Sequence, residues 1–353
     1  MKISPLVLPN QGFAEQISLR HFQTEDAPAI ANLFLAVYGE AYPAKIYYEP
    51  SQLIQANLEE RTISFIAQTQ SGEIVGHLAL YLSAPSTKVY EMGAGLILPA
   101  YRMQNLFTPL LQYTIDYITK TSKEIIAIFG EAVCNHVKTQ KSIKGIAMKE
   151  SALGLDAMPI EAYSQEQSAT GRVSTLITFL VLHPKPHKVY IPITYQTEAY
   201  FIYEGLGEKR QFIYSDASMQ PNGENINDVK VQVYPFAQLA RLAVTQAAAD
   251  FDEHLLACEA EARRQCAAEQ QTVQVFQCWL SLIQPHSEWL VARLREHGYF
   301  FGGILPYWFE HDALLMQKIN YPPQWEQIEL LSQRGKELCA FVHNDWKSIK
   351  SIS

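Results

Sequence analysis

The chain has 353 residues, 48% of them hydrophobic and 11% aromatic, so it is long enough to form two domains with sizeable cores. Its net charge of −8 and its lack of a basic run argue against a nucleic-acid-binding surface, which needs clustered Lys and Arg. Five cysteines without CxxC spacing, no signal peptide and no apolar run near the roughly 20 residues that cross a bilayer predict a cytoplasmic protein without disulfides, a metal site or membrane contact.

The predicted elements begin with a strand at residues 17–22. Thr24 is expected to cap a helix whose apolar residues recur at i, i+3, i+4 and i+7, and Gly39 is expected to end it. Ser51 is expected to cap a second helix that runs to Leu58. Two strands then pair as a hairpin across the turn 70–73. The elements that follow are predicted as strands at 89–98, 125–133, 152–159 and 173–183 and helices at 108–119 and 137–144.

Residues 91–111 join a half-buried strand, through Pro99 and a short polar loop, to a helix. The first N–H groups of a helix have no intrahelical partners, and the helix dipole favours negative charge there. We therefore predict an anion site in this loop. Asn105 lies in the loop, and Asn is the least costly replacement for Gly where the backbone needs a positive φ.

This order of strand, Pro, Tyr-Arg, loop and helix resembles the acyl-CoA pyrophosphate site of the GNAT superfamily of N-acyltransferases, whose pattern is Gln/Arg-x-x-Gly-x-Gly/Ala. Here the pattern reads Arg102-Met103-Gln104-Asn105-Leu106-Phe107. Asn105 and Phe107 therefore stand where the family has Gly or a small residue. The resemblance covers roughly residues 16–184, and it implies an α+β fold in which an acyl-CoA lies between the fourth and fifth strands.

The resemblance also implies which residues act. Acetyl-CoA or another acyl-CoA would be the co-substrate, and an amine of a small molecule or peptide would be the acceptor. The pantetheine would contact the main chain of Gly95, Leu96 and Ile97 and the side chain of Asn135. The pyrophosphate would lie at Arg102, Met103, Gln104, Asn105, Leu106, Phe107 and Thr108. Glu91 and Glu131 lie on the right strands for the base that takes the proton of the amine, although either could be an exposed or ion-paired strand residue.

The second half of the chain starts with a similar junction. A strand at 188–193 precedes Gln196-Thr197-Glu198 and a helix, as the first strand precedes Gln23-Thr24-Glu25. Later elements, at 273–283, 288–297, 299–306 and 312–319, repeat the order strand, helix and strand pair. A weak internal repeat explains both observations, so we predict two GNAT-like lobes, 1–184 and 185–353, each a mixed central sheet flanked by helices. The second lobe has no copy of the anion-binding loop, because its stretch 240–249 leads into a helix with an acidic start. A last helix is predicted at 325–341.

Three functions remain open at this point. The first is an N-acyltransferase, most simply an N-acetyltransferase, whose C-terminal lobe shapes the pocket for the acceptor. The second is a GNAT-like module that binds an acyl-CoA for regulation with little or no turnover. Asn105, Phe107 and the lack of Tyr in the helix 137–144, where many family members carry a general acid, favour this second function. The third is a protein that binds no CoA.

Overall fold

The computed structural model describes residues 6–8, 16–159, 171–207, 210–222 and 226–350. The chain divides into two compact units: unit 1 is Met1–Glu131 with Ser142–Ala147, and unit 2 is Ala132–Lys141 with Met148–Ser353. Each unit contains a mixed sheet with helices packed on it, which confirms the predicted α+β class. This division follows packing, whereas the boundary predicted after residue 184 refers to a duplication. The two-lobe repeat stays a prediction.

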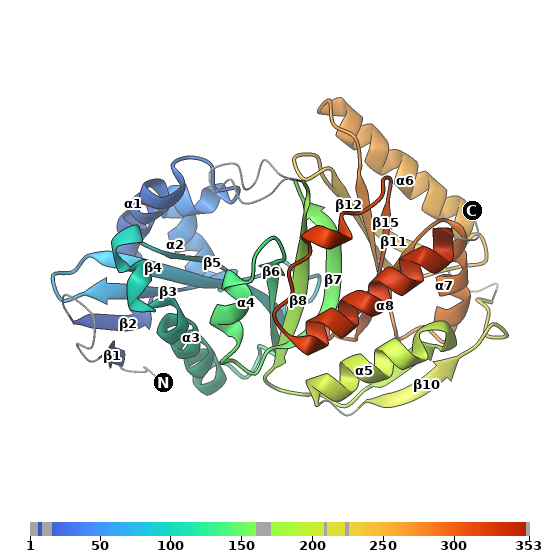
Figure 1. Ribbon diagram of the computed structural model, residues 1–353, viewed down its shortest axis with the longest axis horizontal. Coiled ribbons are helices and arrows are strands. Elements are labelled where there is room, and N and C mark those ends of the chain that lie inside the picture. Colours follow the sequence, from blue (N-terminus) through green and yellow to red (C-terminus); the bar gives the residue numbers. More distant parts are fainter. Residues whose placement is uncertain (1–5, 9–15, 160–170, 208–209, 223–225, 351–353) are drawn as a thin grey trace. The chain divides into compact units, whose positions relative to one another are not determined.

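The sheet of unit 1 has the strand order β1-β2-β3-β4-β5-β6 (Figure 1). Neighbouring strands from β1 to β5 pair antiparallel, and β5 pairs parallel with β6. The hairpin predicted across 70–73 is confirmed as β3 and β4. The strands are β1 (Leu6–Leu8), β2 (Ile17–His21), β3 (Thr62–Thr69), β4 (Ile74–Tyr81), β5 (Val89–Ile97) and β6 (Ala127–Val133).

Helices cover both faces of this sheet. Ile66 of β3 lies in a core with residues of α1 (Ala27–Tyr38) and α2 (Pro50–Leu58). The preceding residue, Phe65, contacts Tyr113 and Tyr117 of α3 (Phe107–Thr121). Because successive strand residues point to opposite faces, α3 covers the face of the sheet that α1 and α2 do not cover.

Two predicted helix caps are wrong. α1 begins at Ala27, after the 3-10 turn η1 (Thr24–Asp26), because the Asp26 carboxylate accepts the N–H of Gln23 at 2.7 Å and organises the turn. α2 begins at Pro50, before Ser51, since the fixed φ of Pro suits the first helical turn. The predicted end of α1 is confirmed, because Gly39 has φ +57° and its N–H donates to the carbonyl of Leu35.

The sheet of unit 2 has the strand order β8-β7-β14-β15-β13-β12-β11, and β9 and β10 form a separate parallel pair. Most neighbours pair antiparallel, whereas β12 and β13 pair parallel. The strands are β7 (Lys149–Met158), β8 (Val173–Val181), β9 (Lys188–Pro192), β10 (Gln211–Ser215), β11 (Asp228–Tyr234), β12 (Leu239–Gln246), β13 (Val275–Ser281), β14 (Phe300–Leu305) and β15 (Ala313–Ile319). β10 and β11 were not among the predicted strands.

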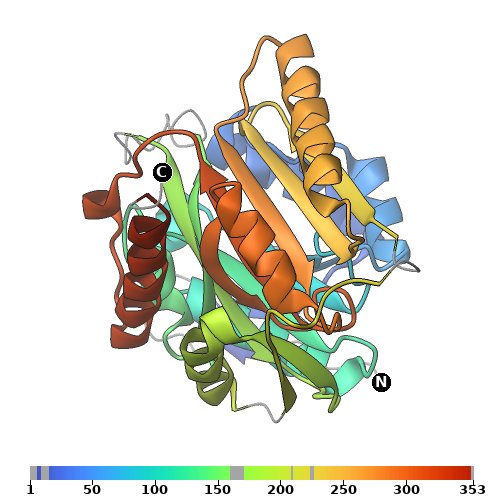
Figure 2. The same cartoon turned by 90° about the vertical axis from the view of Figure 1, so that its right-hand side faces the viewer.

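Four helices of unit 2 share one large core with its strands. α5 and α8 pack on β7 and β14, and α6 packs along β11 (Figure 2, with α6 in orange and α8 in dark red). The helices are α5 (Gln196–Leu206), α6 (Phe251–Ala268), α7 (Ser287–Glu296) and α8 (Gln333–Lys350), with short 3-10 turns η5 (Ile193–Tyr195) and η6 (Trp325–Gln327). The short helix α4 (Lys138–Ile143), like β6, contains a point where the chain passes between the units.

The last helix begins later than the predicted residue 325. After η6 the chain is extended, because the side-chain amide of Gln140 binds the backbone carbonyl of Glu329 and the backbone N–H of Leu331, each at 2.9 Å. The helix α8 starts at Gln333, where the Ser332 hydroxyl accepts the N–H of Gly335 at 2.9 Å. The start of this helix therefore depends on a contact with Gln140, which is distant in the sequence.

A buried ionic cluster connects the segment 183–187, between β8 and β9, to the core of unit 2. The carboxylate of Asp312 accepts the Tyr203 hydroxyl at 2.7 Å and the Nε–H of Arg210 at 2.9 Å. Its other oxygen accepts the N–H of Tyr307 at 2.9 Å and lies 3.2 Å from His187 Nε2. The side chains of Asp312 and Arg210 are both fully buried. Burial alone would raise the pKa of Asp312, but His187 and Arg210 hold that pKa well below its usual value.

His187 should make the stability of unit 2 depend on pH. Burial lowers its pKa, but the hydrogen bond and charge of Asp312, with the carbonyl of Lys185, outweigh burial, and the pKa ends above 6.5. The protonated ring therefore makes its full contribution to the free energy of unfolding below about pH 6.5. This contribution is lost as the pH rises through the folded-state pKa of His187. We expect His187→Gln to cost more stability at about pH 6 than at about pH 8.5 in urea unfolding. An equal cost at both values would contradict this assignment.

Candidate functional site

Strands β5 and β6 of unit 1 pair only at their beginnings. The parallel register joins Val89–Glu91 to Ala127–Phe129, whereas β5 continues to Ile97 and β6 to Val133. The predicted contact residues Gly95, Leu96 and Ile97 all lie on this later part of β5. An extended ligand that carries amide groups can add to such a strand as a peptide does.

A bulge interrupts β5 in this part. Ala79 pairs with Gly93 and His77 with Leu96, so Ala94 and Gly95 stand together opposite Leu78. Ala94 has φ +50°, which is unusual for a residue with a Cβ. His77 Nδ1 donates to the carbonyl of Ala94 at 2.8 Å, and the ring is fully buried. Since the peptide is trans, the N–H of Gly95 points away from His77. Sequence reasoning missed this role, although a His within the apolar strand IVGHLALY was a visible signal.

His77→Phe should destabilise the bulge. Burial lowers the pKa of His77 to about 4, against the hydrogen bond to Ala94, so the ring is neutral at pH 7 and Nδ1 carries the proton that the carbonyl accepts. Phe keeps the ring but leaves a buried carbonyl unpaired, which costs about 1–3 kcal/mol. The measurement is amide hydrogen exchange of β4 and β5, and unchanged protection of Gly95 and its neighbours would show that His77 does not hold the bulge.

The predicted anion-binding loop is a 3-10 turn followed by a left-handed residue. η3 (Pro99–Gln104) ends at Asn105, which has φ +52° and ψ +32°, as expected for an Asn that replaces Gly. Arg102 Nε donates to the carbonyl of Ile97 at 3.1 Å, and Thr108 Oγ1 lies 3.4 Å from Asn105 Oδ1. The structure gives the backbone of Met103 and Gln104, and their side chains lie outside the described part.

The first turn of α3 is suited to an anion at its start. The helix begins at Phe107, one residue before the predicted Thr108, and Leu106 is the N-cap residue, which has no side-chain cap. No acidic residue occurs in the first turn, and Pro109 has no N–H to donate. The N–H groups of Phe107 and Thr108 are therefore at the N-terminal end of the dipole, without a carboxylate that would compete with a phosphate.

Phe107 lies against the strand that it follows. A Cβ added at Gly95 would come within 2.7 Å of Phe107 Cε2 and 3.0 Å of Leu78 Cδ1. The ring is half-buried and therefore covers one face of β5 at Gly95. A side chain at position 95 would therefore have to displace this ring.

Glu91 lies in a group of tyrosines. Its carboxylate accepts the Tyr81 hydroxyl at 2.7 Å, across the β4–β5 pair. Burial, together with neighbouring tyrosines and the charge of Glu91, raises the pKa values of Tyr42, Tyr47 and Tyr81. These hydroxyls are neutral at pH 7, so a carboxylate among them has hydrogen-bond donors that do not neutralise its charge.

Glu131 and Asn135, the other two side chains predicted to contact ligands, are assigned to different units. Glu131 is half-buried near the end of β6 and belongs to unit 1. Asn135 follows β6, belongs to unit 2 and lines a polar cavity there with Asp156 and Ser174. Its predicted contact with pantetheine, like the role of each residue in the predicted site, stays a prediction.

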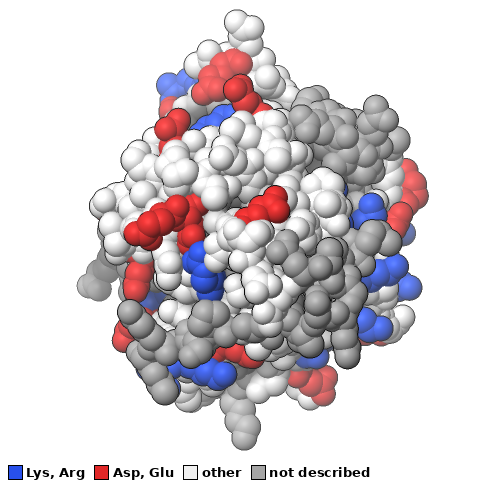
Figure 3. Space-filling model, turned by 90° about the vertical axis from the view of Figure 1, so that its left-hand side faces the viewer, with Lys and Arg blue, Asp and Glu red and all other residues white. Residues whose placement is uncertain are grey.

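Lys and Arg are scattered among acidic and uncharged residues on the face in Figure 3. Within the described ranges, no group of three or more His, Cys, Asp and Glu is placed to hold a metal ion. None of the described helices is both long and apolar enough to cross a membrane.

No protein-family model matches this sequence, and no curated protein matches it. Acetyltransferases are among the solved structures that match. They include the ribosomal-protein-S5-alanine acetyltransferase of Vibrio fischeri, with 13% identity, a TM-score of 0.39 and coverage of 50% of this chain and 96% of that one.

Two further matches are of the same kind. The ribosomal-protein-S18-alanine N-acetyltransferase of Escherichia coli has 18% identity, a TM-score of 0.37 and coverage of 48% of this chain and 96% of that one. The spermidine N-acetyltransferase of Vibrio cholerae, solved with CoA and spermine, has 13% identity, a TM-score of 0.38 and coverage of 47% and 95%. These three matches cover about half of this chain and nearly all of each matching structure.

Proposed function

We propose that this protein is an acyl-CoA-dependent N-acyltransferase, with acetyl-CoA as the simplest donor and an amine as the acceptor. The observation that carries the proposal is the early end of the β5–β6 pairing, combined with the bulge at Ala94 and Gly95. Together they give an extended edge, next to a helix N-terminus, for a ligand that has both amide groups and a pyrophosphate.

The residues of the loop fit the pyrophosphate. Asn105 turns the chain in a left-handed conformation. The N–H groups of Phe107 and Thr108 are then the first two of the helix α3. Gly95, Leu96 and Ile97 would bind the pantetheine through their main chain. When bound, the acyl-CoA supplies a thioester carbonyl for attack by the amine.

The amine must lose a proton as it attacks, and the C–S bond of the thioester breaks as the new C–N bond forms. We propose that Glu91 is the general base that accepts this proton, because its carboxylate lies among neutral tyrosine hydroxyls. Glu131 is the alternative base. The thiol of free Cys has a pKa of about 8.5, and a CoA thiolate of comparable basicity can leave without strong general-acid help.

A second function is favoured by Phe107. Its ring covers β5 at Gly95, where a small residue at position 107 would leave the strand open. This contact favours a module that binds an acyl-CoA for regulation with weak turnover or none. For the acceptor we propose only its class, which is an amine of a small molecule or a peptide.

The experiment compares CoA binding in two variants with the same change in charge. Thr108→Glu puts a carboxylate in the first turn of α3, where the dipole stabilises it and a pyrophosphate would be repelled. Gln112→Glu puts the same charge on an exposed position of the same helix. We expect CoA at about 1 mM to stabilise the wild type, since a ligand at 100 times its Kd adds about 2.7 kcal/mol.

Thr108→Glu should weaken CoA binding at least about tenfold, which is about 1.4 kcal/mol, and Gln112→Glu should leave it within about twofold. No stabilisation of the wild type by CoA or acetyl-CoA would exclude both functions. Binding without thiol release over a panel of amines would support the regulatory module over the enzyme.

A further inference from the structure

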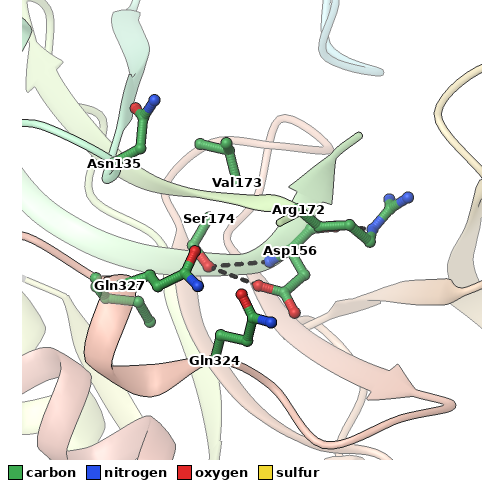
Figure 4. Close-up of a pocket in the computed structure, with 8 residues that line it drawn as sticks. Asn135, Asp156, Arg172, Val173, Ser174, Gln324 and Gln327 are labelled. Atoms are coloured by element: carbon green, nitrogen blue, oxygen red, sulfur yellow. Dashed lines mark hydrogen bonds between the residues drawn. The ribbon is translucent and has the colours of Figure 1, made fainter. Parts of the chain in front are cut away.

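A polar cavity lies within unit 2. Its lining comes from the segment after β6, from β7 and β8, and from the segment around η6 (Figure 4). Asp156 and Ser174 are buried at the inner end, whereas Gln324 is exposed. The space is about that needed for one water molecule. The lining residues are Asn135, Asp156, Arg172, Val173, Ser174, Gln324, Gln327 and Ile328.

The backbone is distorted to place Asp156 there. Gly154 pairs with Thr175 and Met158 with Val173, so three residues of β7 stand opposite Ser174 alone. Asp156, in the middle of this bulge, has φ +49°. A non-glycine residue in this conformation costs of order 1–3 kcal/mol, and such residues cluster at functional sites. The bulge is therefore a structural feature that costs stability and directs one carboxyl group into the cavity.

Ser174 fixes the orientation of this carboxyl group. Its hydroxyl donates to Asp156 Oδ1 at 3.1 Å, and its oxygen accepts the N–H of Asp156 at 3.0 Å. Figure 4 shows the amide groups of Gln324 and Gln327 facing the same carboxyl group. Acceptor oxygens from a carboxylate and two amides can thus reach one small group at this point.

The charge of Asp156 is only partly compensated. Burial raises the pKa of Asp156, while Tyr321, Ser174 and the charge of Arg172 lower it less. Arg172 donates through Nε to the backbone carbonyl of Asp156 at 2.8 Å, and its other nitrogens donate to Ala237 and Gln238. In Figure 4 the guanidinium group points away from the carboxylate. A cation that reached the carboxylate would remove an electrostatic cost that the fold now carries.

We propose that this cavity binds the primary ammonium group of a small amine, with the Asp156 carboxylate as its main acceptor. An ammonium group is about the size of a water molecule and donates three hydrogen bonds, which matches a cavity of this size with acceptor oxygens around it. The rest of the amine would pass Gln324 toward solvent. The proposal rests on Asp156 and uses neither the residues assigned to the pyrophosphate nor the proposed base.

The test titrates the full-length protein with propylammonium and follows the side-chain amide resonances of Gln324, Gln327 and Asn135 by NMR. Propanol and tetramethylammonium are the comparison ligands, because the first has no charge and the second cannot donate a hydrogen bond. We expect saturable shifts with propylammonium and binding of either comparison ligand at least about tenfold weaker. Equal binding of propanol, or no saturable shift with propylammonium up to about 100 mM, would overturn the proposal.

Asp156→Asn should weaken propylammonium binding about tenfold or more, since the amide has nearly the same shape without the charge. The matched control is Glu326→Gln on η6, which removes one exposed carboxylate near the same cavity and should change binding less than about twofold. If Asp156→Asn does not fold, Gln324→Leu replaces an exposed side chain and should weaken binding severalfold. Unchanged binding in Asp156→Asn, or in Gln324→Leu where the first variant is unfolded, would contradict the site.

Discussion

Asp312→Asn is expected to lower the free energy of unfolding of unit 2 by about 3–5 kcal/mol, the largest effect on stability that we predict for a single substitution. The carboxylate accepts hydrogen bonds from Tyr203, Arg210 and Tyr307, and its side chain is fully buried. Asn has nearly the same volume but no charge, so the buried guanidinium of Arg210 would lose its compensating ion. An uncompensated buried charge is what makes the breaking of such a pair costly.

Tryptophan fluorescence reports on this change selectively. All five tryptophans, Trp279, Trp289, Trp308, Trp325 and Trp346, lie in unit 2. The matched control is Glu261→Gln, which removes the carboxylate of an exposed ion pair with Arg264 on α6 and should cost less than about 1 kcal/mol. The measurement is the free energy of urea unfolding of both variants, followed by tryptophan fluorescence. A loss in Asp312→Asn no larger than that of the control would mean that the cluster adds no net stability.

Glu91→Gln is expected to lower kcat by about 10²–10⁴ with little change in the affinity for acetyl-CoA, and this is the largest effect on activity that we predict. The amide keeps the shape of the side chain and an oxygen that can accept the Tyr81 hydroxyl, but it cannot take a proton from the amine. The loss would therefore appear in the chemical step and not in binding. The measurement is thiol release from acetyl-CoA with an amine acceptor, beside a binding titration of the same variant.

Two further variants separate the alternatives. Tyr81→Phe removes the hydroxyl that orients Glu91, and it should lower kcat less than Glu91→Gln does, because the base itself remains. Glu131→Gln tests the rival base. An unchanged kcat in Glu91→Gln with a lowered kcat in Glu131→Gln would identify Glu131 as the base. An unchanged kcat in both variants would contradict the proposed acid–base chemistry.

Much of the fold could be predicted because its signals are local. The apolar periodicity of α1, the Gly at its end and the turn between β3 and β4 each depend on a few neighbouring residues. The φ of Asn105 could also be anticipated, since few residues other than Gly adopt that conformation. The weaker predictions were helix starts, where Asp26 and Pro50 displaced the expected caps. The strands β10 and β11 were also missed, although only β10 is short, with five residues against seven in β11.

By itself, the sequence determined the succession of strands and helices, the loop at Asn105 and the likeness to an acyl-CoA site, because alternation, turn residues and helix ends are local properties of a chain. Only the tertiary structure decided that β5 leaves β6 after Glu91, that His77 holds the carbonyl of Ala94 and that Tyr81 donates to Glu91. It also decided that Asp156 is aimed into a cavity by a bulge. Each of these depends on strand register, and register is set by partners distant in the chain, which no local pattern specifies.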